Sequence, residues 1–246
     1  MKHTLMFRIC LFTTLLSQPE LRAQTINDYI RSNQQRLIGE YFQFLSIPNV
    51  AADSEHILLN VDFISGMMEK RDIHPHILNG ITPGVTPAVF GEIKTKGATK
   101  TIGFYAHYDG QPVNPKQWHA GLEPFKPLYL SGSLEHGGTI IGPYKDNMPI
   151  DPEWRISGRG SADDKAGVMA ILNAYESLIK TGNKLAVNIK FLFEGEEEVG
   201  SIHLDEIFGQ NKDLLKADLW IVIDGPRHIS GRKTIAFGVR GDINVA

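Results

Sequence analysis

The chain has 246 residues, of which 42% are hydrophobic and 22% are charged, and its formal net charge at pH 7 is −3. The length suits one large α/β domain or two small ones, and the acidic balance argues against nucleic acid or an anionic membrane as the partner. No basic run with interleaved aromatic residues occurs, so the sequence gives no local support for nucleic-acid binding.

The first 23 residues resemble a secretory signal peptide. Lys2 precedes an apolar stretch over residues 5–16, and Ala23 offers a small residue at the expected cleavage position. The stretch is too short to predict a membrane span. We expect an exported, periplasmic or extracellular protein if this signal is genuine, and a cytoplasmic one otherwise. Cleavage would also remove Cys10, the only cysteine, which excludes a disulfide or a thiolate ligand from the mature chain.

Hydrophobic periodicity predicts helices and strands in alternation. Apolar residues recur at helical spacing over residues 26–45 and again over residues 54–71. Runs of β-branched and aromatic residues then predict strands at 88–93 and 101–106. Residues 110–155 are rich in Pro, Gly and Trp, and we expect a long irregular loop there with one hairpin at most.

The second half of the chain predicts a βαβ-like unit. A helix is expected from residue 161 to about 180, followed by strands at 186–193 and 219–223 with a helix at 204–215 between them. Residues 234–246 read as one more strand. Together these elements predict an α/β fold in which helices flank a central mixed, mostly parallel sheet.

Acidic residues or a histidine follow several of these strands. Because ligands gather at the carboxyl ends of strands in open α/β sheets, we expect these groups to meet at one rim. Carboxylates at the mouth of a buried strand need a metal, a partner charge or a pKa shift to compensate them. One imidazole with several carboxylates is the ligand set of a hydrolytic metal site. The candidate residues are His107, Asp109, Asp163, Glu197, Glu198 and Asp224.

Simpler interpretations exist for parts of this set. The run Glu196, Glu197 and Glu198 could be a solvated charge cluster, and Asp163 with Asp164 could be first-turn acids favoured by a helix dipole. Which pair of the three glutamates is functional depends on their register with the Gly-Ser turn that follows. The other histidines are expected on the surface or in loops rather than as ligands, among them His119, His136, His203 and His228.

Four segments, in order, resemble the motifs of one co-catalytic metallopeptidase family. That family includes carnosine dipeptidase, glutamate carboxypeptidase, aminoacylase, acetylornithine deacetylase and succinyl-diaminopimelate desuccinylase. The Gln-Pro pair at residues 111–112 and Trp118 resemble the dipeptidase branch most closely. The resemblance implies a three-layer fold of the zinc-peptidase type. The motif segments are residues 107–113, 158–165, 197–201 and 224–225.

The resemblance implies two divalent metal ions, with zinc as the first expectation and manganese or cobalt as alternatives. It implies that His107, Asp163 and Asp224 bind one ion, and that Asp163 also bridges to a second ion held by Glu198. It further implies a cis peptide bond between Asp163 and Asp164.

The resemblance also implies catalytic roles. Glu197 would be the general base, and Asp109 would fix the tautomer of His107. The reaction would be the hydrolysis of an amide bond in a dipeptide or short peptide by a water activated at the metals. An N-acyl-amino-acid deacylase would use the same residues and is the nearest alternative. A non-catalytic binding protein on the same scaffold is a second alternative, although such a protein has no need of a general base.

The family has a lid and dimerisation domain inserted before its last metal ligand, a histidine near the C-terminus. We therefore expect residues 24–238 to be the N-terminal part of the catalytic domain and residues 239–246 to begin a truncated lid. Residues 1–246 alone are expected to be inactive or nearly so. A homodimer is one expectation for the full-length protein.

Overall fold

The computed structural model describes residues 25–225, 230, 232 and 234–237. The expected signal peptide and the expected start of a lid lie outside the described residues, so both stay predictions. Most of the strand expected at 234–246 also lies outside, and its four described residues form no strand. In the part of the chain that is described, no helix combines the length and the apolar character needed to span a membrane.

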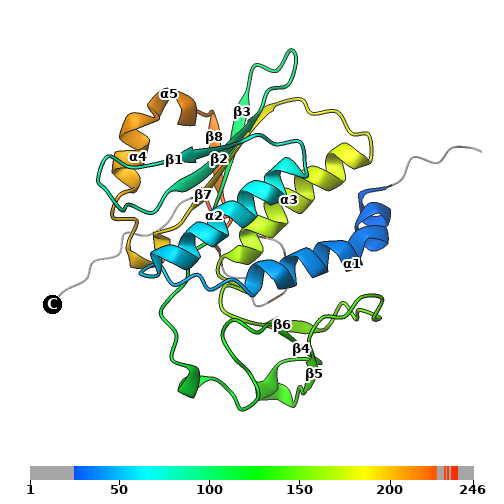
Figure 1. The fold of residues 1–246 in the computed structure, drawn as a ribbon. Coiled ribbons are helices and arrows are strands. Elements are labelled where there is room, and N and C mark those ends of the chain that lie inside the picture. Colours follow the sequence, from blue (N-terminus) through cyan, green and yellow to red (C-terminus); the bar gives the residue numbers. More distant parts are fainter. Residues whose placement is uncertain (1–24, 226–229, 231, 233, 238–246) are drawn as a thin grey trace, which may run out of the picture.

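Five strands form the main sheet, in the order β1-β2-β7-β3-β8 (Figure 1). The pairs β1–β2 and β2–β7 are antiparallel, whereas β7–β3 and β3–β8 are parallel. Only β2 therefore runs against the other four, which confirms the mixed, mostly parallel sheet. The strands are β1 (Pro75–Leu78), β2 (Ala88–Ile93), β3 (Thr101–His107), β7 (Asn188–Glu194) and β8 (Leu219–Val222).

Helices cover both faces of this sheet, as expected for three layers. On one face, Val89, Phe191 and Phe193 pack against α2 and α3, and α1 lies against α3. On the other face, Phe90 and Leu192 pack against α4 and α5. Successive strand residues thus alternate between two cores. The helices are α1 (Ile26–Leu45), α2 (Ser54–Glu69), α3 (Lys165–Lys180), α4 (Leu204–Gln210) and α5 (Lys212–Leu215).

Two expected helices differ in their bounds. The helix expected at 204–215 is divided at Asn211, which ends α4 and precedes α5. The side-chain amide of Asn211 donates through Nδ2 to the backbone carbonyl of Ile207 at 2.8 Å. This local bond competes with continuation of the helix. The helix expected from residue 161 begins at Lys165, because residues 161–164 carry the site described below.

The segment over residues 110–155 is mostly irregular and holds one hairpin, β4–β5, as expected, but the expectation missed that this hairpin belongs to a sheet. This segment contributes to a second sheet of order β5-β4-β6, which lies beside α1 (Figure 1). The ring centroid of Phe42 on α1 lies 4.7 Å from that of Tyr129 on β4, and the ring of Trp154 also packs on Tyr129, at 5.3 Å. Each strand has three residues, too few to show a period of two. The elements are η1 (Pro115–Gln117), β4 (Leu128–Leu130), η2 (Leu134–His136), β5 (Ile140–Gly142) and β6 (Arg155–Ser157).

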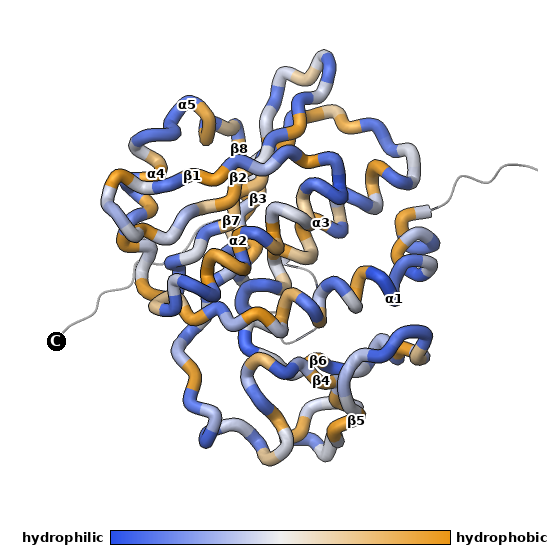
Figure 2. The backbone as a smooth tube through the Cα atoms, viewed as in Figure 1, coloured by the Kyte–Doolittle hydropathy of each residue, from blue (hydrophilic) through white to orange (hydrophobic). Residues whose placement is uncertain are grey.

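Hydropathy along the backbone agrees with these layers. Figure 2 shows hydrophobic stretches in the central strands and a hydrophilic connection between β2 and β3. Charged groups are nevertheless buried between the first three helices, where Arg71 bonds Glu40 at 2.6 Å and Asn173 at 2.9 Å. Arg71 Nε also lies 2.9 Å from Glu176 Oε2 as an ion pair without hydrogen-bond geometry.

The Glu176 carboxylate is a clear target for testing this cluster. Burial alone would raise its pKa, but the hydrogen bond from Tyr29 and the charges of Arg71 and Arg36 lower the pKa below its usual value. Its contribution to stability is therefore present above the unfolded-state pKa of about 4.3 and is lost as the pH falls through the folded-state value.

We expect Glu176→Gln to lower the free energy of unfolding at pH 7 by about 3–5 kcal/mol, because it leaves Arg71 buried with one charge partner fewer. The difference in free energy of unfolding between the variant and the wild type should become smaller below about pH 4, where Glu176 becomes protonated. Urea unfolding at neutral and acid pH measures both effects. Glu123→Gln, which breaks only the exposed pair with Lys126, is the control and should change stability by at most about 1 kcal/mol. Equal losses in the two variants would contradict the prediction.

Candidate metal centre

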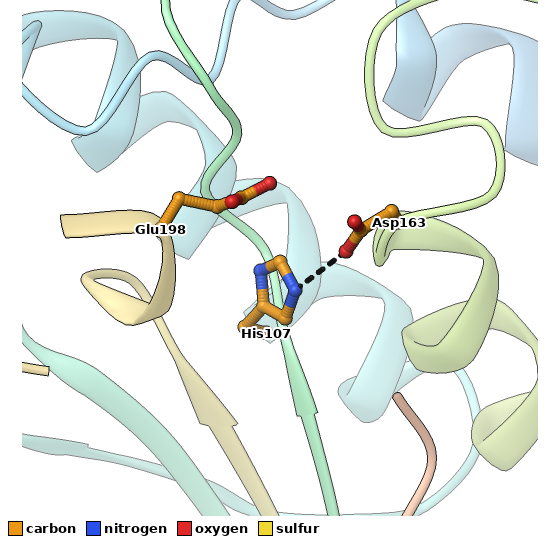
Figure 3. A group of neighbouring side chains, drawn as sticks. All are labelled: His107, Asp163 and Glu198. Atoms are coloured by element: carbon orange, nitrogen blue, oxygen red, sulfur yellow. Dashed lines mark hydrogen bonds and ion pairs between the residues drawn. The ribbon is translucent and has the colours of Figure 1, made fainter. Parts of the chain in front are cut away.

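His107 is the last residue of β3, and its side chain has no exposed surface. Its Nδ1 lies 3.2 Å from Asp109 Oδ1, and its Nε2 lies 2.9 Å from Asp163 Oδ1. Figure 3 shows His107, Asp163 and Glu198 arriving from three separate segments of the chain and meeting above the strand ends. In the tautomer whose Nδ1–H donates a hydrogen bond to Asp109, Nε2 carries no proton and can bind a cation.

Asp109 does more than orient the imidazole. Its buried carboxylate also accepts the backbone N–H groups of Glu197 at 3.2 Å and Glu198 at 3.0 Å. These two residues begin the 3-10 turn η3 (Glu197–Val199) that follows β7. One side chain thus fixes both the histidine and the turn that carries the glutamates. No local pattern predicts this second contact, because it joins residues 88 and 89 positions apart in the chain.

The Asp163–Asp164 peptide bond is cis, as expected. The two carboxylates separate: Asp163 points into the site with 63% of its side chain exposed, while Asp164 is buried. Asp164 caps α3 through the N–H of Gly167 at 3.0 Å and also accepts the N–H of His107 at 3.2 Å. Only Asp164 is therefore the helix-capping acid of the simpler interpretation.

The structure also separates the three consecutive glutamates. Glu196 accepts the N–H of Thr86 at 3.2 Å, and its other oxygen lies 2.9 Å from Nδ1 of His203. Glu197 instead places Oε2 3.7 Å from Nε2 of His107. Glu198 accepts a 2.6 Å hydrogen bond from Gln111. Glu197 and Glu198 thus lie beside His107, whereas Glu196 pairs with His203 and Thr86.

Gln111 is a residue for which sequence reasoning gave no role. It lies inside the first motif segment and stood out only as a marker of the dipeptidase branch. A glutamine side chain holding one oxygen of Glu198 leaves the other oxygen for a different partner.

Among the described residues, two groups of side chains have ligand atoms close enough to hold a metal ion. In each group, which is either His107, Asp163 and Glu198 or His107, Glu197 and Asp224, the ligand atoms lie within 4.8 Å of one another. Asp224 follows β8 and places Oδ1 3.8 Å from Nε2 of His107. Neither group equals the expected set of His107, Asp163 and Asp224, so the geometry by itself does not separate a ligand from a general base.

The electrostatics of the centre suit a divalent cation. Burial raises the pKa of Glu197 and Asp224, and neighbouring carboxylates raise both further. Burial alone would lower the pKa of His107, but the hydrogen bond and charge of Asp109, with Asp164 and Asp224, raise it to about 10. Neighbouring carboxylates thus contribute to all three shifts, and a divalent cation would neutralise their negative charge. Nitrogen and carboxylate donors in this proportion fit zinc, manganese or cobalt.

Comparisons with known proteins agree with this centre. The sequence model of peptidase family M20/M25/M40 matches residues 103–239, which include every candidate residue. The chain is 30% identical over 210 residues to the Beta-Ala-His dipeptidase of Homo sapiens, covering 84% of this chain and 35% of that protein. It is 26% identical over 226 residues to a Cys-Gly metallodipeptidase of Schizosaccharomyces pombe, covering 87% of this chain and 43% of that protein.

Solved structures show the same fold. An M20 family metallo-carboxypeptidase from Sulfolobus solfataricus superimposes with a TM-score of 0.63 at 30% identity, covering 80% of this chain and 39% of that one. Human carnosine dipeptidase 1 also gives 0.63, at 21% identity, covering 81% and 40%. The chain thus spans less than half the length of these proteins.

Gly195, between β7 and the glutamates, is a place where packing under the centre can be tested. A Cβ there would overlap the Tyr108 hydroxyl and the Thr86 methyl group, whereas a Cβ at Gly66 in α2 meets no neighbour within 4 Å among the described residues. We expect Gly195→Ala to lower the free energy of unfolding by about 1–3 kcal/mol. Gly66→Ala should raise it by up to about 1 kcal/mol, through helix propensity. Thermal unfolding measures both, and a neutral Gly195→Ala would contradict this packing.

Proposed function

The chain belongs to peptidase family M20/M25/M40, and we propose that it carries the catalytic centre of a metal-dependent dipeptidase. The observation that carries the proposal is the convergence of one imidazole and four carboxylates at the carboxyl ends of three parallel strands and the start of α3. Two of its relatives are named as dipeptidases, which supports a dipeptide as the substrate proposed here. Since the chain covers less than half of each relative, the substrate and the activity of the whole protein are part of the proposal.

In this proposal His107, Asp163, Glu198 and Asp224 hold two divalent ions, with zinc as the first choice. When bound, such ions polarise a carbonyl and lower the pKa of a water molecule. The residues themselves set the arrangement: Asp109 fixes the imidazole through Nδ1, and Gln111 holds one oxygen of Glu198. Asp163 is more exposed than His107, Glu197 and Asp224, so its carboxylate would be open to a bound cation.

Glu197 is the general base of this proposal. Its backbone is held by Asp109, while its carboxylate is about one-third exposed and can meet a substrate. Burial raises the pKa of this carboxyl, which makes it a better proton acceptor than an ordinary glutamate. Glu197 would take a proton from the attacking water and deliver it to the nitrogen of the leaving amine. The C–N bond then breaks, and two amino acids are released.

Glu197→Gln tests the assignment of the base. We expect the rate of dipeptide hydrolysis in the whole natural protein to fall by about 10²–10⁴-fold, because proton transfer is lost. Zinc affinity should stay unchanged, since the proposal gives Glu197 no ligand role. Glu196→Gln is the matched control, because its carboxylate bonds Thr86 and lies against His203 outside the centre. Rates are measured by amino-acid release with added zinc, and with chelator as the blank.

Three results would count against the proposal. Undiminished hydrolysis by Glu197→Gln would remove Glu197 as the base. A large loss of zinc affinity in that variant would make Glu197 a ligand instead. Preference for N-acyl-amino acids over dipeptides in a substrate panel would make the protein a deacylase with the same centre.

A further inference from the structure

We propose that Asn49, in the turn between α1 and α2, is a positioning residue of the metal centre. It braces the segment that carries His107 and Asp109 against the segment that leads to Asp163. The inference rests on the proposed function only in requiring that the centre bind a divalent cation. Asn49 is fully buried and lies outside the four motif segments.

Asn49 bonds the first ligand segment from both its side chain and its backbone. Its Nδ2 donates to the carbonyl of Tyr108 at 2.9 Å, and its own carbonyl accepts the N–H of Gly110 at 2.7 Å. The neighbouring Val50 forms a parallel β-bridge with Gly110. The peptide between Tyr108 and Asp109 is therefore held from one side by Asn49, directly before the carboxylate that orients His107.

The same turn reaches the second ligand segment. A Cβ at Gly160, which has a φ of +76°, would lie 3.3 Å from Asn49 Nδ2. Beyond the cis bond, the buried Lys165 donates to the carbonyls of Phe44 at 2.7 Å and Ile47 at 2.8 Å. Residues 44–49 thus lie close to Gly160 before Asp163, bond Lys165 after it, and bond the segment after His107.

Glycines leave the space that this carboxamide fills. A Cβ at Gly110 would lie 2.9 Å from Asn49 Nδ2 and 3.0 Å from Arg159 Cδ, so a larger residue there would displace the brace. Gly110 and Gly160 belong to the two different ligand segments, and the Asn49 side chain is packed between them. A rigid link of this kind sets the distance between His107 and Asp163 before any cation binds.

Loss of the brace should weaken cation binding, because the ligands would have to be ordered at the moment of binding. A general loss of packing would instead lower stability and leave affinity unchanged. Asn60 provides the matched control. It is equally buried, also has an Oδ1 without a hydrogen-bond partner among the described residues, and donates only to the carbonyls of Pro48 and His56.

The experiment compares Asn49→Leu with Asn60→Leu in the whole natural protein. Leucine keeps the branched skeleton of four heavy side-chain atoms and removes the amide donor. Three quantities are measured: zinc affinity by competition with a chelator, the free energy of unfolding of the metal-free protein, and dipeptide hydrolysis at saturating zinc. If Asn49→Leu does not fold, Asn49→Ser takes its place.

We expect Asn49→Leu to lower zinc affinity by about 10–100-fold, as is typical for residues that orient ligands. Asn60→Leu should lose comparable stability with a clearly smaller loss of zinc affinity, because Asn60 bonds the turn at Pro48 but neither ligand segment. Saturating zinc should restore most of the activity of Asn49→Leu. Equal zinc affinities in the two variants, with a zinc-binding and active wild type, would overturn this inference alone. A wild type that binds no divalent cation would overturn the proposed function as well.

Discussion

The buried carboxylate of Asp109 is the constraint on which the rest of the centre depends. A charge without exposed surface persists only if its oxygens are hydrogen-bonded. Here the partners are the imidazole of His107 and the N–H groups of Glu197 and Glu198. Since these groups follow the neighbouring parallel strands β3 and β7, satisfying one charge fixes two strand ends relative to each other. Glu197 and Glu198, the proposed general base and a proposed metal ligand, are both held by hydrogen bonds to this one carboxylate.

The centre is buried on one side and open to solvent on the other. His107 and Asp109 are inaccessible to solvent, whereas Asp163 is largely exposed. Asp164 and Lys165, next to it in the chain, turn inward to cap α3 and to anchor the turn after α1. Asp163 is thus open to solvent, whereas its neighbours Asp164 and Lys165 hold the surrounding backbone in place. This division lets several carboxylates lie close together above a sheet whose core is apolar.

Local pattern sufficed where an element is long enough to show it. The bounds of α1 follow from the helical spacing of its apolar residues, and those of β2 and β3 from runs of β-branched and aromatic residues that the sheet buries. It was not sufficient for β4, β5 and β6, whose three-residue strands are too short to show a period and whose contact with α1 is made by Phe42 and Tyr129. It also failed at Asn211, where a side-chain bond to the backbone divides a helix.

The sequence by itself determined the chemistry: a histidine and carboxylates placed after strands, in the order and spacing of a known metallopeptidase family. That information is local, because each motif is a strand end followed by its own turn. Only the tertiary structure decided which glutamates face His107, since that choice depends on the bonds of Glu196 to Thr86 and His203. It alone revealed the second role of Asp109 and the place of Asn49, because both depend on contacts between segments far apart in the chain, which no local pattern encodes.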